Sequence, residues 1–105
     1  MSELKQLPRQ GTLDLLKRYQ DQSIFYSNEK DKLFELRILL GEQRKVLSLA
    51  YGETNSGMAQ TIIDSEIEDI DKQLKTAKEE EDFAINNMNY FKEVARAFEA
   101  ALKKF

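Results

Sequence analysis

A sustained heptad pattern in the second half of the chain constrains the fold more than any other feature. Stepping from Ile63 to Phe105 by alternating intervals of four and three residues gives thirteen positions, of which twelve are apolar. They are Ile63, Ile67, Ile70, Leu74, Ala77, Glu81, Ala84, Met88, Phe91, Ala95, Phe98, Leu102 and Phe105. This pattern is typical of a helix that packs lengthwise against another helix. It predicts one helix over 57–105, with the asparagine-rich stretch 86–89 as the alternative place for a break.

A first helix is expected over 12–51, with a wider apolar face. One seam of alternating four- and three-residue steps has eight apolar positions out of eleven: Leu15, Tyr19, Gln22, Tyr26, Glu29, Leu33, Leu36, Leu40, Gln43, Leu47 and Ala50. Further apolar residues lie beside this seam, so its face is wider than a two-stranded contact requires. Pro8 and Gly11 predict a separate N-terminal arm over 1–11, with Thr12 as the N-cap of the helix.

A turn is expected over 52–56, where the breaker residues of the chain gather. Gly52 is suited to ending the first helix, and Asn55 or Ser56 to capping the second. Since the chain has only 105 residues, the expected fold is a single all-α domain. It is an elongated antiparallel helical hairpin of two long, coiled-coil-like helices (12–105), which completes a bundle by oligomerisation or partner binding.

The charges suggest a register for this hairpin. If the chain reverses at the turn, residues whose numbers sum to about 110 lie side by side, so Asp71 is expected near Arg37. The same register places Glu81, the one charge on the second seam, beside Lys30. We therefore predict a polar layer formed by Lys30 and Glu81, a device that can fix register at some cost in stability.

The composition argues against most chemistries. The chain contains neither cysteine nor histidine, so the thiol nucleophile, the common metal ligand and the usual general base near neutral pH are all missing. The acidic run 64–71 lacks the spacing and glycine of a calcium loop, and its acids share a solvated helix face. A net charge of −3 argues against nucleic-acid binding. The expectation is a non-enzymatic protein with no cofactor and no metal.

The apolar runs are too short to span a bilayer, and the first residues lack the apolar core of a signal peptide. A cytoplasmic location is expected, with export that needs no cleaved signal as the alternative. Residues 89–105 form a basic amphipathic helix that could bind a membrane surface. Packing of its aromatic face against Leu13, Leu15, Leu16 and Tyr19 of the first helix, or equally against a second subunit, is the favoured interpretation, because the seam continues unbroken into this stretch.

The excess apolar surface predicts a function in protein–protein interaction. A two-helix hairpin has one internal interface, which cannot cover two wide apolar faces. The residues expected to contact a partner are Leu36, Leu39, Leu40, Tyr90, Phe91, Val94, Phe98, Leu102 and Phe105. We expect a small chaperone, targeting partner or assembly scaffold for another helical protein, joined as a homo-oligomer or a hetero-complex. The alternatives are a peripheral membrane protein that uses 89–105 and an inhibitor that masks a partner's surface.

The expected outline is similar to that of the small helical hairpins of type VII secretion, and export chaperones and phage assembly proteins share it. The residues that mark the secretion family are absent. Tyr51 and Gly52 stand where that family has Trp-x-Gly, and Val94 follows Tyr90 where its export signal has an acid. The similarity covers size and layout, and it implies no residue roles.

Overall fold

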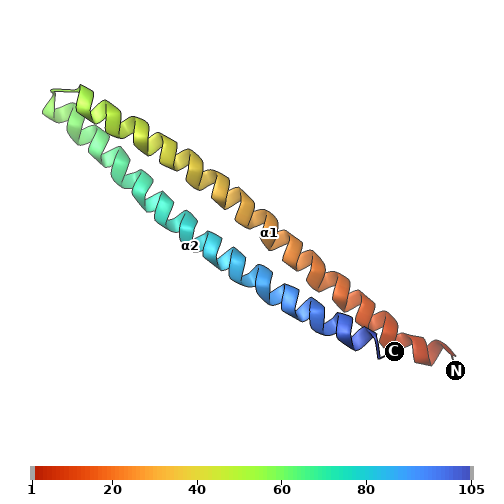
Figure 1. Cartoon of the computed structure of the whole chain (residues 1–105). Coiled ribbons are helices and arrows are strands. Elements are labelled where there is room, and N and C mark those ends of the chain that lie inside the picture. The colour runs from red at the N-terminus through yellow and green to blue at the C-terminus, as the bar shows by residue number, and fades with distance from the viewer. Residues whose placement is uncertain (1, 105) are drawn as a thin grey trace. The chain divides into compact units, whose positions relative to one another are not determined.

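The chain forms two long helices that run antiparallel (Figure 1). The computed structural model describes the backbone of residues 2–104 and the side chains of residues 8–104. Helix α1 spans Ser2–Glu53 and helix α2 spans Gly57–Leu102, and the described residues contain no strand. The predicted all-α antiparallel hairpin is therefore confirmed. Helix α2 also continues through 86–89, where the Asn87 side-chain amide donates to the Phe83 carbonyl at 2.8 Å.

Helix α1 begins at Ser2, so the expected boundary between an arm and a helix at residue 12 is wrong. Pro8 lies inside the helix. A proline within a helix removes one backbone donor and crowds the preceding turn, which is why it suggested a boundary. The Thr12 hydroxyl is accordingly not an N-cap, and donates instead to the Pro8 carbonyl at 2.7 Å.

Side-chain capping defines the turn between the helices. Ser56 caps α2, as predicted, because its hydroxyl accepts a hydrogen bond from the Ala59 amide at 3.3 Å. The Gln60 side chain donates to the Thr54 carbonyl at 3.0 Å, and the Thr54 hydroxyl accepts from the Ser56 amide at 3.2 Å. Gly52 does not end α1: it lies within the helix and has no positive φ. These side chains satisfy the turn without a left-handed glycine.

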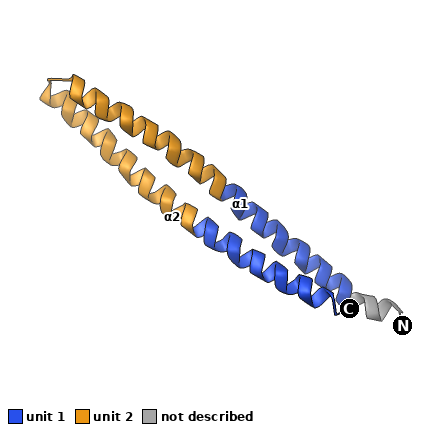
Figure 2. Cartoon of the chain, viewed as in Figure 1, with its two compact units in different colours: residues 1–29, 83–105 blue, residues 30–82 orange. Residues whose placement is uncertain are grey.

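The chain divides into two compact units, each an antiparallel pair of helix segments (Figure 2). Unit 1 comprises Met1–Glu29 and Phe83–Phe105, and unit 2 comprises Lys30–Asp82, including the turn. Small side chains make up much of the interface between the helices: Ala77 in unit 2, and Ser23, Ala84 and Ala95 in unit 1, are all buried. The larger buried side chains are Leu16, Leu40, Ile70 and Met88. Such a thin interface leaves much apolar surface uncovered in each unit.

Candidate protein-binding surfaces

A buried carboxylate interrupts the apolar seam of unit 2. Glu81 is 7% exposed, and its carboxylate accepts a hydrogen bond from the Arg37 guanidinium at 2.7 Å. The polar layer expected at Glu81 is present, but its cation is Arg37 and not Lys30. The Lys30 ammonium lies 3.7 Å from the carboxylate of Asp31, its neighbour in the chain.

A second ion pair of unit 2 shows the same shift of register. Asp71, expected near Arg37, accepts hydrogen bonds of 2.6 and 3.3 Å from Arg44. Both observed cations therefore lie seven residues closer to the turn than expected. Side chains on a helix lean towards its N-terminus, so in an antiparallel pair they lean in opposite directions along the common axis. When two long side chains meet across the helices, their residue numbers therefore add up to more than those of two residues whose backbones lie side by side.

The Arg44–Asp71 pair is exposed on both sides. Hydrogen bonding from Arg44 lowers the pKa of Asp71 below its ordinary value, and the same hydrogen bonds raise the pKa of Arg44. An exposed pair of this kind contributes little to stability, and it serves to align one edge of the helix pair.

Half-buried, stacked aromatic rings join the two helix segments of unit 1. Tyr19 stacks on Phe91 and Phe98, with ring centroids 5.9 and 5.4 Å apart. Phe91 also stacks on Tyr26, with ring centroids 5.9 Å apart. Phe91 and Phe98, two of the expected partner-binding residues, therefore contact the first helix. Of the packing expected for the C-terminal aromatic face, the contacts with Tyr19 are observed.

The other predicted interaction residues divide by exposure. Leu40 is buried between the helices and is not available to a partner. Val94 and Leu102 are half-buried, and Phe105 lies outside the described residues. Leu36, Leu39 and Tyr90 are exposed and remain candidates for partner contact. These residues differ in exposure because only one side of each wide apolar face can pack against the other helix.

An apolar groove with acidic edges runs along one side of unit 2. Its floor and walls come from Leu39, Val46, Leu47 and Ile70, and Glu42, Gln43 and Glu66 lie at its edges. Leu39 is 51% exposed and Val46 is 65% exposed. Large aliphatic side chains are seldom left this open along a continuous groove unless another molecule covers them.

Unit 1 presents a stripe of aromatic side chains, which we call the aromatic stripe: Phe25, Phe83 and Tyr90. Phe25 and Phe83 both pack edge-to-face with the Tyr26 ring, with ring centroids 5.1 and 6.3 Å apart. Phe83 and Tyr90 are seven residues apart on α2, so they share one side of that helix. All three stripe residues are more than half exposed.

Phe25, Val46 and Phe83 were not among the predicted interaction residues, although a sequence signal for them exists. Phe25, Leu39 and Val46 are separated by multiples of seven residues, beside the main seam of the first helix. Phe83 and Tyr90 bear the same relation to the second seam. An apolar heptad series parallel to a seam is the pattern expected of a helix with two neighbours.

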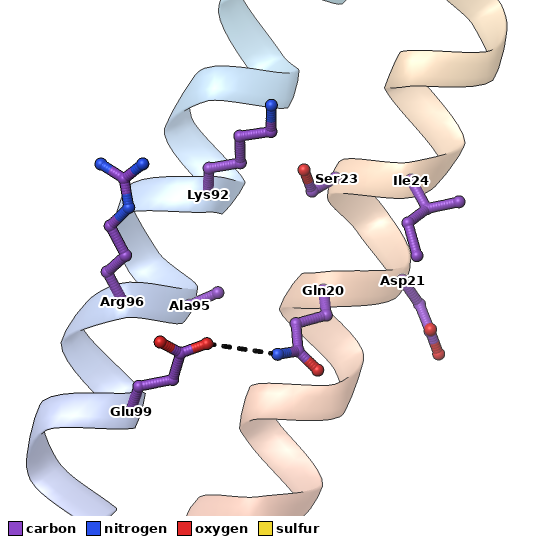
Figure 3. A pocket seen from close by; sticks show the side chains of 8 residues that line it. All are labelled: Gln20, Asp21, Ser23, Ile24, Lys92, Ala95, Arg96 and Glu99. Carbon is purple, nitrogen blue, oxygen red and sulfur yellow. Dashed lines mark hydrogen bonds between the residues drawn. The ribbon is translucent and has the colours of Figure 1, made fainter.

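A second groove, in unit 1, has a polar lining (Figure 3). Ser23 and Ala95 are its small, buried residues, while Lys92, Arg96 and Asp21 carry exposed charges around it. The Gln20 side chain donates across this groove to the Glu99 carboxylate at 3.4 Å, and the Ser23 hydroxyl donates to the Met88 carbonyl at 3.4 Å. Mixed, solvated charges and no buried unpaired polar group give no sign of a ligand here.

Comparison with known proteins yields no matching family, no matching curated protein and no matching solved structure. Two further properties of the described residues bear on function. They contain no group of three acidic, histidine or cysteine side chains placed to hold a metal ion. No helix among them has a stretch long and apolar enough to cross a membrane. The groove of unit 2 and the aromatic stripe of unit 1 are therefore the candidate surfaces for binding a partner.

Proposed function

We propose that this chain is a non-enzymatic protein–protein interaction module that serves as a small chaperone, targeting partner or assembly scaffold for helical proteins. The supporting observation is the exposed apolar surface. Twelve large apolar side chains of the described residues are at least 41% exposed, and no side chain is less than 2% exposed. The accessible surface is 8004 Å², whereas a compact monomer of 12.2 kDa has about 6,100 Å².

The form of this surface favours a helical partner. The groove of unit 2 is lined by residues from two antiparallel helices, and Leu39 and Val46 follow each other at heptad spacing along it. A third helix can lay an apolar stripe into such a groove by the same side-chain packing that joins the first two. Glu42 and Glu66 at the edges favour a partner helix whose stripe is flanked by basic residues.

A photo-crosslinking experiment tests this proposal. The photoreactive residue p-benzoylphenylalanine is placed at Val46, in the groove, or at Lys75, an exposed polar position of unit 2 outside the groove, and cells are irradiated. We expect protein adducts from position 46 that are absent from position 75, joined through helical segments. Equal labelling from both positions, or none from either, would overturn the proposal.

The membrane alternative has weaker support from the structure. The apolar side of the basic C-terminal stretch is partly occupied, because Phe91 and Phe98 stack on Tyr19 within unit 1. Membrane binding would require these rings to leave their partner. Co-sedimentation with vesicles rich in phosphatidylserine distinguishes the two functions: retention that weakens with salt would favour the membrane function, and no retention is expected.

A further inference from the structure

We infer that the partner of the unit 2 groove is a second copy of this chain, and that the aromatic stripe of unit 1 of one molecule docks into the groove of unit 2 of the other. This inference rests on the proposed function and names the partner of the same surface. Each molecule carries both the aromatic stripe and the unit 2 groove, so each can both offer and receive a contact. Reciprocal pairing of this kind closes a two-fold dimer, the commonest symmetric assembly.

Charge complementarity selects this pairing. Unit 1 has eight basic and six acidic residues and thus a net charge of +2, whereas unit 2 has eight basic and thirteen acidic residues and a net charge of −5. Contact between two copies of unit 2 would bring like charges together, and contact between unit 1 and unit 2 brings opposite charges together. Charge of this kind steers association and suppresses the wrong arrangement.

The charges next to the two apolar surfaces follow the same rule. Arg18 precedes Phe25 by one heptad on α1, so the two residues share one side of that helix. The edges of the unit 2 groove carry Glu42 and Glu66. A dimer would therefore bring Arg18, the cation beside the stripe, towards the carboxylates of the groove.

The shapes of the side chains are also suited to each other. The groove is lined by aliphatic residues, and the stripe supplies aromatic residues, which are the usual anchors of protein interfaces. Phe25 and Phe83 each pack edge-to-face with the Tyr26 ring and are still more than half exposed. The anchors are thus held in place before docking, which lowers the entropy cost of association.

Analytical ultracentrifugation of the purified full chain at a series of concentrations tests the inference. We expect a species of twice the 12.2 kDa chain mass that dissociates on dilution and more readily at high salt. Leu39→Glu should yield the monomer mass at every concentration. Ile38→Glu is the matched control, because Ile38 is the adjacent residue, is 49% exposed against 51%, and does not line the groove.

Chemical crosslinking tests the pairing itself and does not depend on how one variant folds. Since the chain has no cysteine, Val46→Cys and Tyr90→Cys each introduce a single thiol. A short bismaleimide should join the two variants in a mixture faster than it joins either variant to itself. A wild-type chain that is monomeric at its highest soluble concentration, or faster joining of Val46→Cys to itself, would overturn the inference.

Failure of this inference is distinguishable from failure of the proposed function. A monomeric pure chain that still gives adducts with a different protein from position 46 in cells would retain the interaction module and exclude the second copy as its partner. A monomeric chain with no such adducts would exclude both.

Discussion

The Arg37 guanidinium donates to the buried carboxylate of Glu81 at 2.7 Å, across the two helices of unit 2. Glu81 occupies a seam position, and the preceding seam residue of unit 2, Ala77, is small and buried. Alanine leaves room beside it for the acid and for the long side chain that reaches it. A charge on a helix interface is costly unless it is paired, and this contact supplies the pair.

Arg37→Ala should lower the free energy of unfolding by about 2 kcal/mol, because it leaves the Glu81 carboxylate buried without its donor. Lys30→Ala is the matched control, since Lys30 lies one heptad before Arg37 and its ammonium is 3.7 Å from the exposed carboxylate of Asp31. Its effect should stay within about 0.5 kcal/mol. Urea denaturation followed by circular dichroism measures both, and equal losses would show that Arg37 does not compensate Glu81.

Removing the acid itself should have the opposite outcome. Glu81→Leu restores an uninterrupted apolar seam, and Arg37 remains solvated because a third of its side chain is already exposed. Replacing a buried ion pair by an apolar contact is often neutral or stabilising. We therefore expect a midpoint of urea denaturation equal to or above that of the wild type. A marked loss of stability would indicate that the leucine does not fit between the helices.

The Arg44–Asp71 pair predicts a dependence of stability on pH. Because hydrogen bonds from Arg44 lower the pKa of Asp71 in the folded state, the pair stabilises the fold above the ordinary carboxyl pKa. This contribution is lost as the pH falls through the lowered pKa. The difference in unfolding free energy between wild type and Asp71→Asn should therefore shrink as the pH is reduced from about 6 to about 2. A difference that grows towards acid would contradict the assigned hydrogen bonds.

Replacing a small, buried interface residue by a larger one should lower the stability of the fold. Ala84→Leu adds three carbons at a site that is 3% exposed, and overpacking of this kind costs about 1–3 kcal/mol. Ala100→Leu, at an exposed position of the same helix, should change stability by less than about 0.5 kcal/mol. Thermal denaturation of the two variants gives the comparison. Equal stability would mean that the helices separate easily at Ala84.

A helical glycine offers a stabilising change. Gly41 lies in the interior of α1, and an added Cβ would meet nothing within 4 Å. Gly41→Ala should raise the free energy of unfolding by about 1 kcal/mol, through better helix propensity and a less flexible unfolded chain. The gain would be read from the urea midpoint. No gain would show that α1 is already frayed at this position in the native state.

The sequence alone was sufficient to determine the fold class and the position of the turn, and it restricted the cap of the second helix to Asn55 or Ser56. These features depend on interactions between residues close in the chain: a heptad period over many turns, a cluster of breakers and a hydroxyl three residues before an amide. The arm expected before Thr12 is the exception. A single proline costs one hydrogen bond, which a long helix can absorb.

Only the tertiary structure decided which residues pair across the helices and which apolar residues stay outside. Glu81 selects Arg37 over Lys30 because side chains lean towards the N-terminus of each helix, a displacement that residue spacing does not reveal. Likewise Phe91 stacks on the other helix and Leu40 is buried, while Leu39 and Tyr90 are more than half exposed. A wide apolar face is compatible with several rotations about the helix axis, and the packing of two such faces selects one of them.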